Sequence, residues 1–223
     1  MVNTNLHLII SGFGGKMGKC IRALLAGTPA HVYDARHCLS DCLQPLVWVD
    51  FSNSNAFEQI LENVQKKACP LVMGTTGLSK AQMRQLVQLS KKQAVVYDSN
   101  FSIGANILKK LVHQAGSTLK DFSVTIFEAH HSTKKDQPSG TAKSLRQVLL
   151  SEQRKRIPIL SLRGGGIRGE HSVIFSGMDE MLSLKHEVLD RKVFAQGALC
   201  AVEWIIRKKP SHGLFNMQDV LAA

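Results

Sequence analysis

Short apolar runs and helix-like stretches alternate along the first half of the chain. An apolar run at 6–10 precedes a glycine-rich turn at 11–18, and a helix-like stretch at 19–26 follows it. Later segments repeat this order, with strands expected at 31–33, 48–51, 70–73 and 94–97 and a helix expected at 55–67. Strands and helices in alternation predict a mainly parallel sheet, whose ligands gather at the carboxyl ends of the strands.

The second half of the chain predicts a helix at 103–113, with Ile103, Ile107, Leu108 and Leu111 on one face. The later expected elements are strands at 122–127, 157–162, 172–176 and 181–188 and helices at 141–150 and 194–207. A chain of 223 residues can form one large domain or two small ones, and either can bury a sufficient core.

The glycine-rich turn lies between a predicted strand and a predicted helix, which is the context of a dinucleotide-binding fingerprint. Glycines there allow close backbone approach, so that a pyrophosphate can sit on the helix N-terminus. The spacing departs from G-x-G-x-x-G, because Met17 occupies the last glycine position and Gly18 follows it. The alternative is a glycine turn of another kind of α/β protein.

Asp34 ends the second predicted strand, where an acidic residue can meet the adenosine ribose. Arg36 follows two residues later and could instead accommodate the 2′-phosphate of NADPH. An ordinary turn residue is the other interpretation of Asp34. These residues leave the choice of cofactor open.

The segment 128–142 gathers two histidines, two lysines, two carboxylates and a Ser-Gly-Thr turn directly after a predicted strand. A histidine titrates near neutral pH and can give a proton to a developing carbanion. The turn 138–141 would present backbone N–H groups to an anion at a helix N-terminus. A solvated loop whose Ser139 or Thr141 caps a helix is the simpler alternative, but capping leaves the paired histidines unexplained. The segment predicts proton delivery to an anionic substrate.

This segment resembles the signature of the dihydrodipicolinate reductase family, E-x-H-H-x-x-K-x-D-x-P-S-G-T-A. Every fixed position of the signature matches, namely Glu128, His130, His131, Lys134, Asp136, Pro138, Ser139, Gly140, Thr141 and Ala142. The turn at 12–18 also resembles the family's Gly-x-Gly-Gly-x-Met-Gly variant, and the turns at 74–77 and 100–102 are similar to the family's. The chain departs from the family at Asp98, Ser99 and Asp190 and is shorter between Cys38 and Trp48.

The resemblance implies an α/β protein with a Rossmann-like dinucleotide-binding domain and an inserted α+β substrate and oligomerisation domain that contains a mixed sheet. We expect residues 1–101 and 192–223 to form the first domain and residues 102–191 to form the second. The implied reaction is the NADH- or NADPH-dependent reduction of 4-hydroxy-tetrahydrodipicolinate, a small dicarboxylate. The family also implies a homotetramer.

The resemblance assigns roles residue by residue. It makes His130 the general acid/base and Lys134 the accompanying proton donor, while His131, Gly140 and Thr141 grip the substrate carboxylates. It implies that the cofactor contacts Gly12, Phe13, Gly14, Gly15, Lys16, Met17, Asp34, Gly74, Thr75, Thr76, Asp98, Ser99, Asn100 and Phe101. We expect no metal, and we expect His171 to be a hydrogen-bonded structural histidine.

Composition bears on the alternatives. The net charge of +11 allows a nucleic-acid-binding protein on a degenerate dinucleotide fold, but the basic residues are dispersed and only 6% of residues are aromatic. A related semialdehyde dehydrogenase would need a cysteine nucleophile, and no cysteine lies between Cys69 and Cys200. Scattered, odd-numbered cysteines, with Cys38 and Cys42 lacking a second ligand pair for zinc, favour reduced thiols. We expect a cytoplasmic protein without a membrane span or signal peptide.

Overall fold

The structure is a computed structural model that describes residues 6–37, 46–150 and 156–222. Cys38, Cys42 and most of the short connection before Trp48 lie outside the described residues. The chain forms two compact units, one built from the residues up to Ser102 together with those from Lys192 onward, and the other from Ile103 to Arg191.

The first unit is built on a parallel sheet. Among the described residues, six strands follow the order β10-β5-β4-β3-β1-β2, and every neighbouring pair is parallel. The strands are β1 (His7–Ser11), β2 (His31–Asp34), β3 (Leu46–Asp50), β4 (Leu71–Met73), β5 (Ala94–Tyr97) and β10 (Gly213–Phe215). Because the strand order reverses at β1, the carboxyl end of β1 is the switch point at which such sheets bind their ligands.

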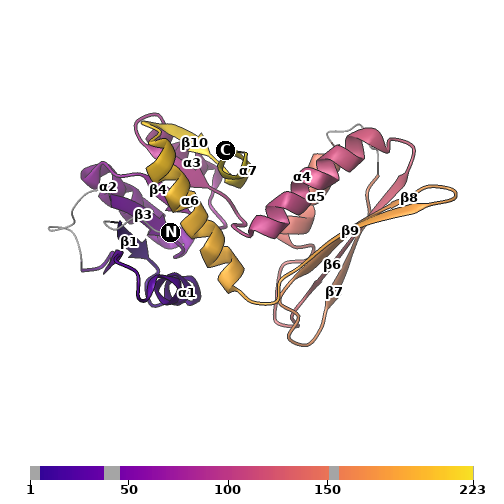
Figure 1. Cartoon of the computed structure of the whole chain (residues 1–223), viewed down its shortest axis with the longest axis horizontal. Helices are drawn as coiled ribbons and strands as arrows, with labels where there is room; N and C mark the ends of the chain where they lie inside the picture. Colours follow the sequence, from indigo (N-terminus) through magenta and orange to yellow (C-terminus); the bar gives the residue numbers. More distant parts are fainter. Residues whose placement is uncertain (1–5, 38–45, 151–155, 223) are drawn as a thin grey trace. The chain divides into compact units, whose positions relative to one another are not determined.

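Helices cover both faces of this sheet (Figure 1). The helical elements are α1 (Lys16–Leu25), η1 (Ser54–Ala56), α2 (Phe57–Lys67), α3 (Lys80–Ser90), α6 (Lys192–Lys208) and α7 (Met217–Leu221). Leu8 and Ile10 of β1 share a core with α1, α6 and α7, whereas Ile9 and Trp48 share a second core with α2 and α3. Alternate residues of one strand thus reach opposite faces, as the pleat of a strand requires.

The second unit is a mixed sheet with two helices. Its described strands follow the order β7-β6-β8-β9, in which β6 and β7 are parallel and the other pairs antiparallel. The elements are α4 (Ile103–Thr118), β6 (Ser123–His130), α5 (Gly140–Leu150), β7 (Ile159–Arg163), β8 (Glu170–Ser176) and β9 (Met181–Glu187). The helices α4 and α5 lie together on one side of the sheet and share its core (Figure 1).

The strand register brings polar side chains into one row across this sheet. Glu128 of β6 lies opposite Ser161 of β7 and His171 of β8, and His171 lies opposite His186 of β9. Directly opposed residues point to the same face, and the neighbouring Ile126 belongs to the core under the helices. The row is therefore on the helix-covered face.

The apolar face predicted for α4 is partly wrong. Leu108 is buried, but Ile103, Ile107 and Leu111 are exposed, and the other large side chain that the helix buries is Val112. The helix contacts the sheet along the side that carries Leu108 and Val112, where small residues of the helix allow close packing. The alternating α/β architecture and the mixed second sheet are as predicted. No helix in the described ranges is both long and apolar enough to cross a membrane.

Candidate active site

The glycine turn after β1 has a backbone that only glycine adopts easily. Gly12 has φ +79°, and a Cβ there would lie 2.6 Å from the carbonyl oxygen of Phe51. Gly14 is exposed, and a Cβ on it would meet no atom within 4 Å, so the outer side of the turn is open. Gly15 precedes α1 without a side-chain cap, and the first turn of α1 contains no acidic residue. The first N–H groups of α1 can therefore serve an anion.

Met17 and Gly18 explain the departure from the common glycine spacing. A Cβ on Gly18 would lie 2.5 Å from the carbonyl oxygens of Gly12 and Phe13, so Gly18 allows the helix to approach the turn. The side chains of Met17 and Phe13 pack against the core, whereas Lys16 is exposed. Met17 and Phe13 are thus partly buried, and the contacts predicted between them and a cofactor stay predictions.

A cavity of about 780 Å³ opens beside this turn. It is lined by Ser11, Gly12, Phe13, Gly14, Gly15, Asp34, Ala35, Arg36, Trp48, Ser52, Asn53, Ala56, Gln59, Ile60 and Asn63. The sequence reasoning missed the polar side chains of Ser52 and Asn53, which precede η1, and of Gln59 and Asn63 in α2. Their only signal was their position after the end of β3, at the same edge of the sheet.

Asp34 and Arg36 form an ion pair at the wall of the cavity. The Arg36 guanidinium donates to Asp34 at 2.7 Å, and the Arg36 backbone N–H donates to the same carboxylate at 3.0 Å. The hydrogen bonds from Arg36 lower the pKa of Asp34. A carboxylate and a guanidinium are therefore both available at the place where the sequence predicted contact with the adenosine ribose.

These residues fit a nicotinamide dinucleotide. The glycine backbone, the uncapped start of α1 and the adjoining cavity match what a pyrophosphate and an adenosine need. The fit uses backbone N–H groups and the ion pair at Asp34.

The turns after β4 and β5 lie at the same edge of the sheet, but they are not among the residues that line the cavity. Gly74 is required there, because a Cβ would lie 2.0 Å from the Phe51 ring. Thr75 is buried and Thr76 is exposed. The predicted contacts of this turn with the cofactor stay predictions.

The turn after β5 uses its polar side chains for its own structure. Asp98 accepts the N–H groups of Asn100 at 3.1 Å and of Met217 at 3.2 Å, so it joins the turn to α7. Asn100 accepts the N–H of Ser102, and Phe101 is buried with its ring edge against Phe51. Ser99 is exposed. A structural role explains the Asp98 carboxylate where the family usually has a small residue.

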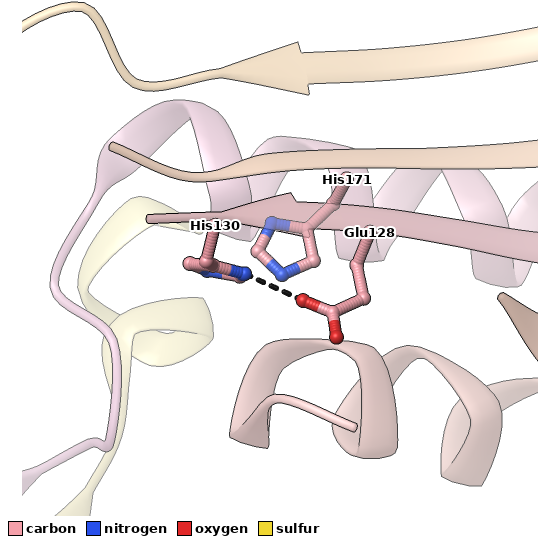
Figure 2. Close-up of side chains that lie close together, drawn as sticks. All are labelled: Glu128, His130 and His171. Atoms are coloured by element: carbon pink, nitrogen blue, oxygen red, sulfur yellow. Dashed lines mark hydrogen bonds and ion pairs between the residues drawn. The ribbon is translucent and has the colours of Figure 1, made fainter. Parts of the chain in front are cut away.

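The second unit contains a buried carboxylate and imidazole at the carboxyl end of β6. Glu128 is 0% exposed, and its Oε2 lies 2.5 Å from Nδ1 of His130. Its Oε1 accepts from the Arg163 guanidinium at 2.8 Å. Figure 2 shows that the side chains of Glu128, His130 and His171 point toward one another from adjacent strands.

Burial and charge set the pKa values of this cluster. Burial by itself raises the pKa of Glu128, but hydrogen bonds, led by that from Arg163, lower it to about 2. Burial lowers the pKa of His130 against the opposing effect of Glu128. Burial and the nearby His130 lower the pKa of His171 to about 4. Glu128 is therefore ionised at neutral pH and His171 is neutral.

The start of α5 is tied to the same cluster. Ser139 is 2% exposed, and its hydroxyl accepts the N–H of Ala142 at 3.2 Å and lies 3.0 Å from Nε2 of His171. Gly140 is exposed and Thr141 is half-buried, in the first turn of the helix. His171 is thus the hydrogen-bonded histidine that we expected, and Ser139 is the cap.

The predicted proton donor Lys134 lies in the loop between β6 and α5. Its Nζ donates to Asp136 at 2.5 Å, and the backbone carbonyl of Asp136 accepts from Arg163 at 2.6 Å. The Lys134 hydrogen bond lowers the pKa of Asp136 against the effect of burial. His131, also in this loop, pairs through Nδ1 with Thr133 at 2.8 Å. Arg163, to which the sequence analysis gave no role, donates hydrogen bonds to both the loop and Glu128.

Glu128, His130 and His171 could also be considered as metal ligands, since one atom from each lies within 4.8 Å of the others. The donor set argues against a cation. Both oxygens of Glu128 already accept hydrogen bonds, Nε2 of His171 faces Ser139, and the Arg163 guanidinium supplies the positive charge. We interpret the cluster as a hydrogen-bonded network.

Comparison with known proteins places the chain in a family. Residues 27–101 match the family profile described as dihydrodipicolinate reductase, N-terminus, and residues 104–221 match the one described as dihydrodipicolinate reductase, C-terminus. The curated 4-hydroxy-tetrahydrodipicolinate reductase of Thermosipho africanus is 42% identical over 95% of this chain and 96% of its own length. That of Rickettsia bellii is 35% identical over 96% of this chain and 94% of its own.

A solved structure shows the same fold. It is a dipicolinate-bound dihydrodipicolinate reductase from Paenisporosarcina sp. TG-14, with a TM-score of 0.76 and 21% identity over 95% of this chain and 97% of that one. The sequence relatives favour a reductase over the semialdehyde dehydrogenase and nucleic-acid-binding alternatives. The chain belongs to the dihydrodipicolinate reductase family.

Proposed function

We propose that the protein reduces 4-hydroxy-tetrahydrodipicolinate to tetrahydrodipicolinate with NADH or NADPH, a step towards diaminopimelate and lysine. Relatives named for this reaction at 42% and 35% identity support the substrate. The observation in the structure that carries the proposal is the buried Glu128–His130 pair, which ends a strand a few residues before the start of α5. A proton donor and an anion-binding helix start are what reduction of a dicarboxylate needs.

When bound, the nicotinamide cofactor supplies the hydride to C4 of the substrate ring. The chain supplies the proton that the reaction also consumes as the C4 hydroxyl leaves as water. His130 in its protonated form is the donor, because Nδ1 donates to Glu128 and the proton on Nε2 is the one that can be transferred. Lys134 is the second proton donor, and its Nζ is held by a hydrogen bond to Asp136.

The substrate carboxylates bind at the start of α5. The backbone N–H groups of Gly140 and Thr141 lie in the first turn of an 11-residue helix and attract an anion through the helix dipole. His131 contributes from the loop. We assign substrate binding to residues 102–191 and cofactor binding to residues 1–101 and 192–223.

The cofactor lies along Gly12 to Met17, with the adenosine in the cavity at Asp34 and Arg36 and the nicotinamide toward Gly74–Thr76, Asp98–Asn100 and Phe101. The Asp34 carboxylate suits the ribose hydroxyls of NADH, whereas Arg36 suits a 2′-phosphate. Because Arg36 can turn from Asp34 to a phosphate, both cofactors are accepted.

The protein forms a homotetramer through the sheet of the second unit. The face of this sheet away from α4 and α5 exposes Leu160 and Leu162 of β7 and Met181 of β9. Neighbouring exposed apolar side chains such as Leu160 and Leu162 on an edge strand are typical of a protein interface.

The experiment is to follow NADH and NADPH oxidation by the purified protein while dihydrodipicolinate synthase makes the substrate from pyruvate and aspartate semialdehyde. We expect oxidation with both cofactors, and none when the synthase is omitted. A folded protein that oxidises neither cofactor under these conditions would refute the proposed reaction.

A further inference from the structure

The carboxylate of Glu128 lies where a core side chain would be expected. It is 0% exposed, and it lies on the same face of β6 as Ile126, which is a core residue. Removing a carboxylate from water is unfavourable unless nearby positive charges and hydrogen bonds offset the lost hydration. Two positive or polar partners, Arg163 and His130, meet it from adjacent positions. Such an arrangement is explained more readily by a function than by stability, since an apolar side chain would pack there at lower cost.

Glu128 determines which nitrogen of His130 carries the proton in the neutral ring. An ionised carboxylate only accepts hydrogen bonds, so Nδ1 of His130 must donate across the 2.5 Å contact. Nε2 is then the acceptor in the neutral ring and the titrating nitrogen. A carboxylate behind a histidine fixes ring orientation and stabilises the imidazolium in the same way in other enzymes.

A glycine, Gly169, lies next to Nε2 at the other end of the His130 imidazole. A Cβ built on Gly169 would lie 3.2 Å from Nε2 of His130, a tight contact. Gly169 has φ +151°, which L residues rarely adopt. Because residue 169 is a glycine, it places no side chain against Nε2 of His130.

The second oxygen of Glu128 reaches the loop that begins α5. Its Oε1 accepts the backbone N–H of Ser139 at 3.4 Å, in addition to the Arg163 guanidinium. Ser139 in turn caps α5 through Ala142 and pairs with His171. One carboxylate thus contacts both the imidazole and the residue directly before Gly140.

We propose that Glu128 is a positioning residue with two arms: Oε2 fixes His130 with Nε2 available to the substrate, and Oε1 holds the Ser139 turn that precedes the carboxylate-binding start of α5. One buried group thereby fixes the positions of the proton donor and the anion site relative to each other. This inference rests on the proposed function, since it assigns Glu128 to the reaction of His130. Glu128 itself touches no substrate.

The decisive variant is Glu128→Gln. The Arg163 guanidinium only donates, so it takes the amide oxygen of the glutamine and turns the amide NH₂ toward His130. Nδ1 of His130 must then accept, and the proton of the neutral ring moves to Nε2. We expect kcat to fall about 10- to 100-fold with a smaller change in KM, as for other residues that orient a reacting histidine.

The pH profile separates this role from a structural one. The charged or titratable groups around His130 are Glu128 on β6, Lys134 in the loop, Arg163 on β7 and His171 on β8. Only Glu128 changes charge in the variant, so the limb of the kcat profile that reports His130 should move to lower pH. A folded Glu128→Gln protein with kcat within twofold of the parent and an unmoved limb would overturn the proposal.

Ser139→Ala is the matched control. It removes the cap of Ala142 and the contact to His171 but leaves the Glu128–His130 bond intact. We expect a raised KM for the dicarboxylate and an unshifted His130 limb. An equal shift of the limb in both variants would mean that general loosening, and not Glu128, sets the titration of His130.

The tautomer can be measured without activity and without a variant at Glu128. Nitrogen-15 NMR of the imidazoles, with the His130 signals assigned by their loss in His130→Gln, should show a neutral ring protonated on Nδ1. Protonation on Nε2 would overturn the proposal even if Glu128→Gln fails to fold. The spectrum does not depend on the substrate, so failure of the proposed reaction and failure of this inference are distinguishable. A zinc requirement, seen as loss of turnover in chelator, would also overturn it.

Discussion

The hydroxyl of Ser139 lies between Nε2 of His171, at 3.0 Å, and the backbone N–H of Ala142, at 3.2 Å. Because this oxygen accepts from Ala142, its own proton can go to Nε2, which accepts only while His171 is neutral. His171 is 4% exposed, and burial together with His130 lowers its pKa to about 4. The start of α5 therefore contacts a histidine that is uncharged at neutral pH.

We predict that the protein loses stability as the pH falls from about 6.5 to about 4. In this window the unfolded chain protonates His171 and the folded chain does not, so the free energy of unfolding decreases as protons are added. A pKa difference of this size corresponds to about 3 kcal/mol once the pH is below both values. Urea unfolding at a series of pH values measures this slope.

The control for this prediction is His171→Gln, which keeps a polar group beside Ser139 but does not titrate. We expect a lower stability at pH 7 and a shallower slope between pH 6.5 and 4. His7, His130 and His186, whose pKa values burial also lowers, contribute to the remaining slope. An unchanged slope in the variant would show that His171 does not carry the acid sensitivity.

Substitutions of Lys134 and of Asp136 should have different effects on kcat. Lys134→Ala removes a proton donor and should lower kcat about 10²- to 10⁴-fold. Asp136→Asn removes only the carboxylate that holds Lys134 at 2.5 Å and leaves the Lys134 amine in place, so we expect a loss below about tenfold. Steady-state kinetics with the coupled synthase assay measures both.

Asp179→Asn is a suitable control, because Asp179 is exposed in the turn between β8 and β9 and should leave kcat unchanged. Lys134→Ala with near-full turnover would exclude Lys134 as a proton donor. A larger loss in Asp136→Asn than in Lys134→Ala would instead give the carboxylate the direct role.

Local sequence signals predicted much of the fold. The parallel sheet could be predicted because β1, β4 and β5 are short apolar runs between helical stretches, and each of these patterns is local. The α4 face was harder to predict, since Ile107 and Leu111 follow the same helical period as Leu108. Which of these side chains is buried depends on where the sheet lies, and this is decided by contacts far away in the sequence.

In the site, too, local sequence signals predicted some features, whereas contacts between distant residues could not be predicted. His130 and Lys134 stand in a continuous signature, so the sequence could identify them as candidates for chemistry. The contacts of Glu128 with Arg163 and Ser139 depend on the pairing of β6 with β7 and on the path of the loop to α5. No local pattern encodes them. Asp98 illustrates the reverse case, a residue in a predicted cofactor turn whose carboxylate instead accepts N–H groups from its own turn and from α7.

Arg36 should determine the use of NADPH. We predict that Arg36→Ala raises KM for NADPH about tenfold or more, because it removes the cation that a 2′-phosphate can bind, and changes KM for NADH by less than about threefold. Asp34→Ala should show the opposite bias, with the larger loss for NADH. Initial rates with each cofactor at varied concentration measure both effects. Equal losses for the two cofactors in Arg36→Ala would contradict the assignment of Arg36 to the phosphate.

The apolar strip on β7 should hold the subunits together. Leu160 is 57% exposed and Leu162 is 48% exposed, and they project from the same face of an edge strand. We predict that the parent has the molar mass of a tetramer in size-exclusion chromatography with light scattering. The double variant Leu160→Lys, Leu162→Lys should have a lower molar mass, because lysines would be buried without partners in the interface. Met178→Lys changes a side chain that is 98% exposed in the turn between β8 and β9 and should leave the mass unchanged. A double variant with the mass of the parent would place the interface elsewhere, and a parent that runs as a monomer would refute the assembly itself.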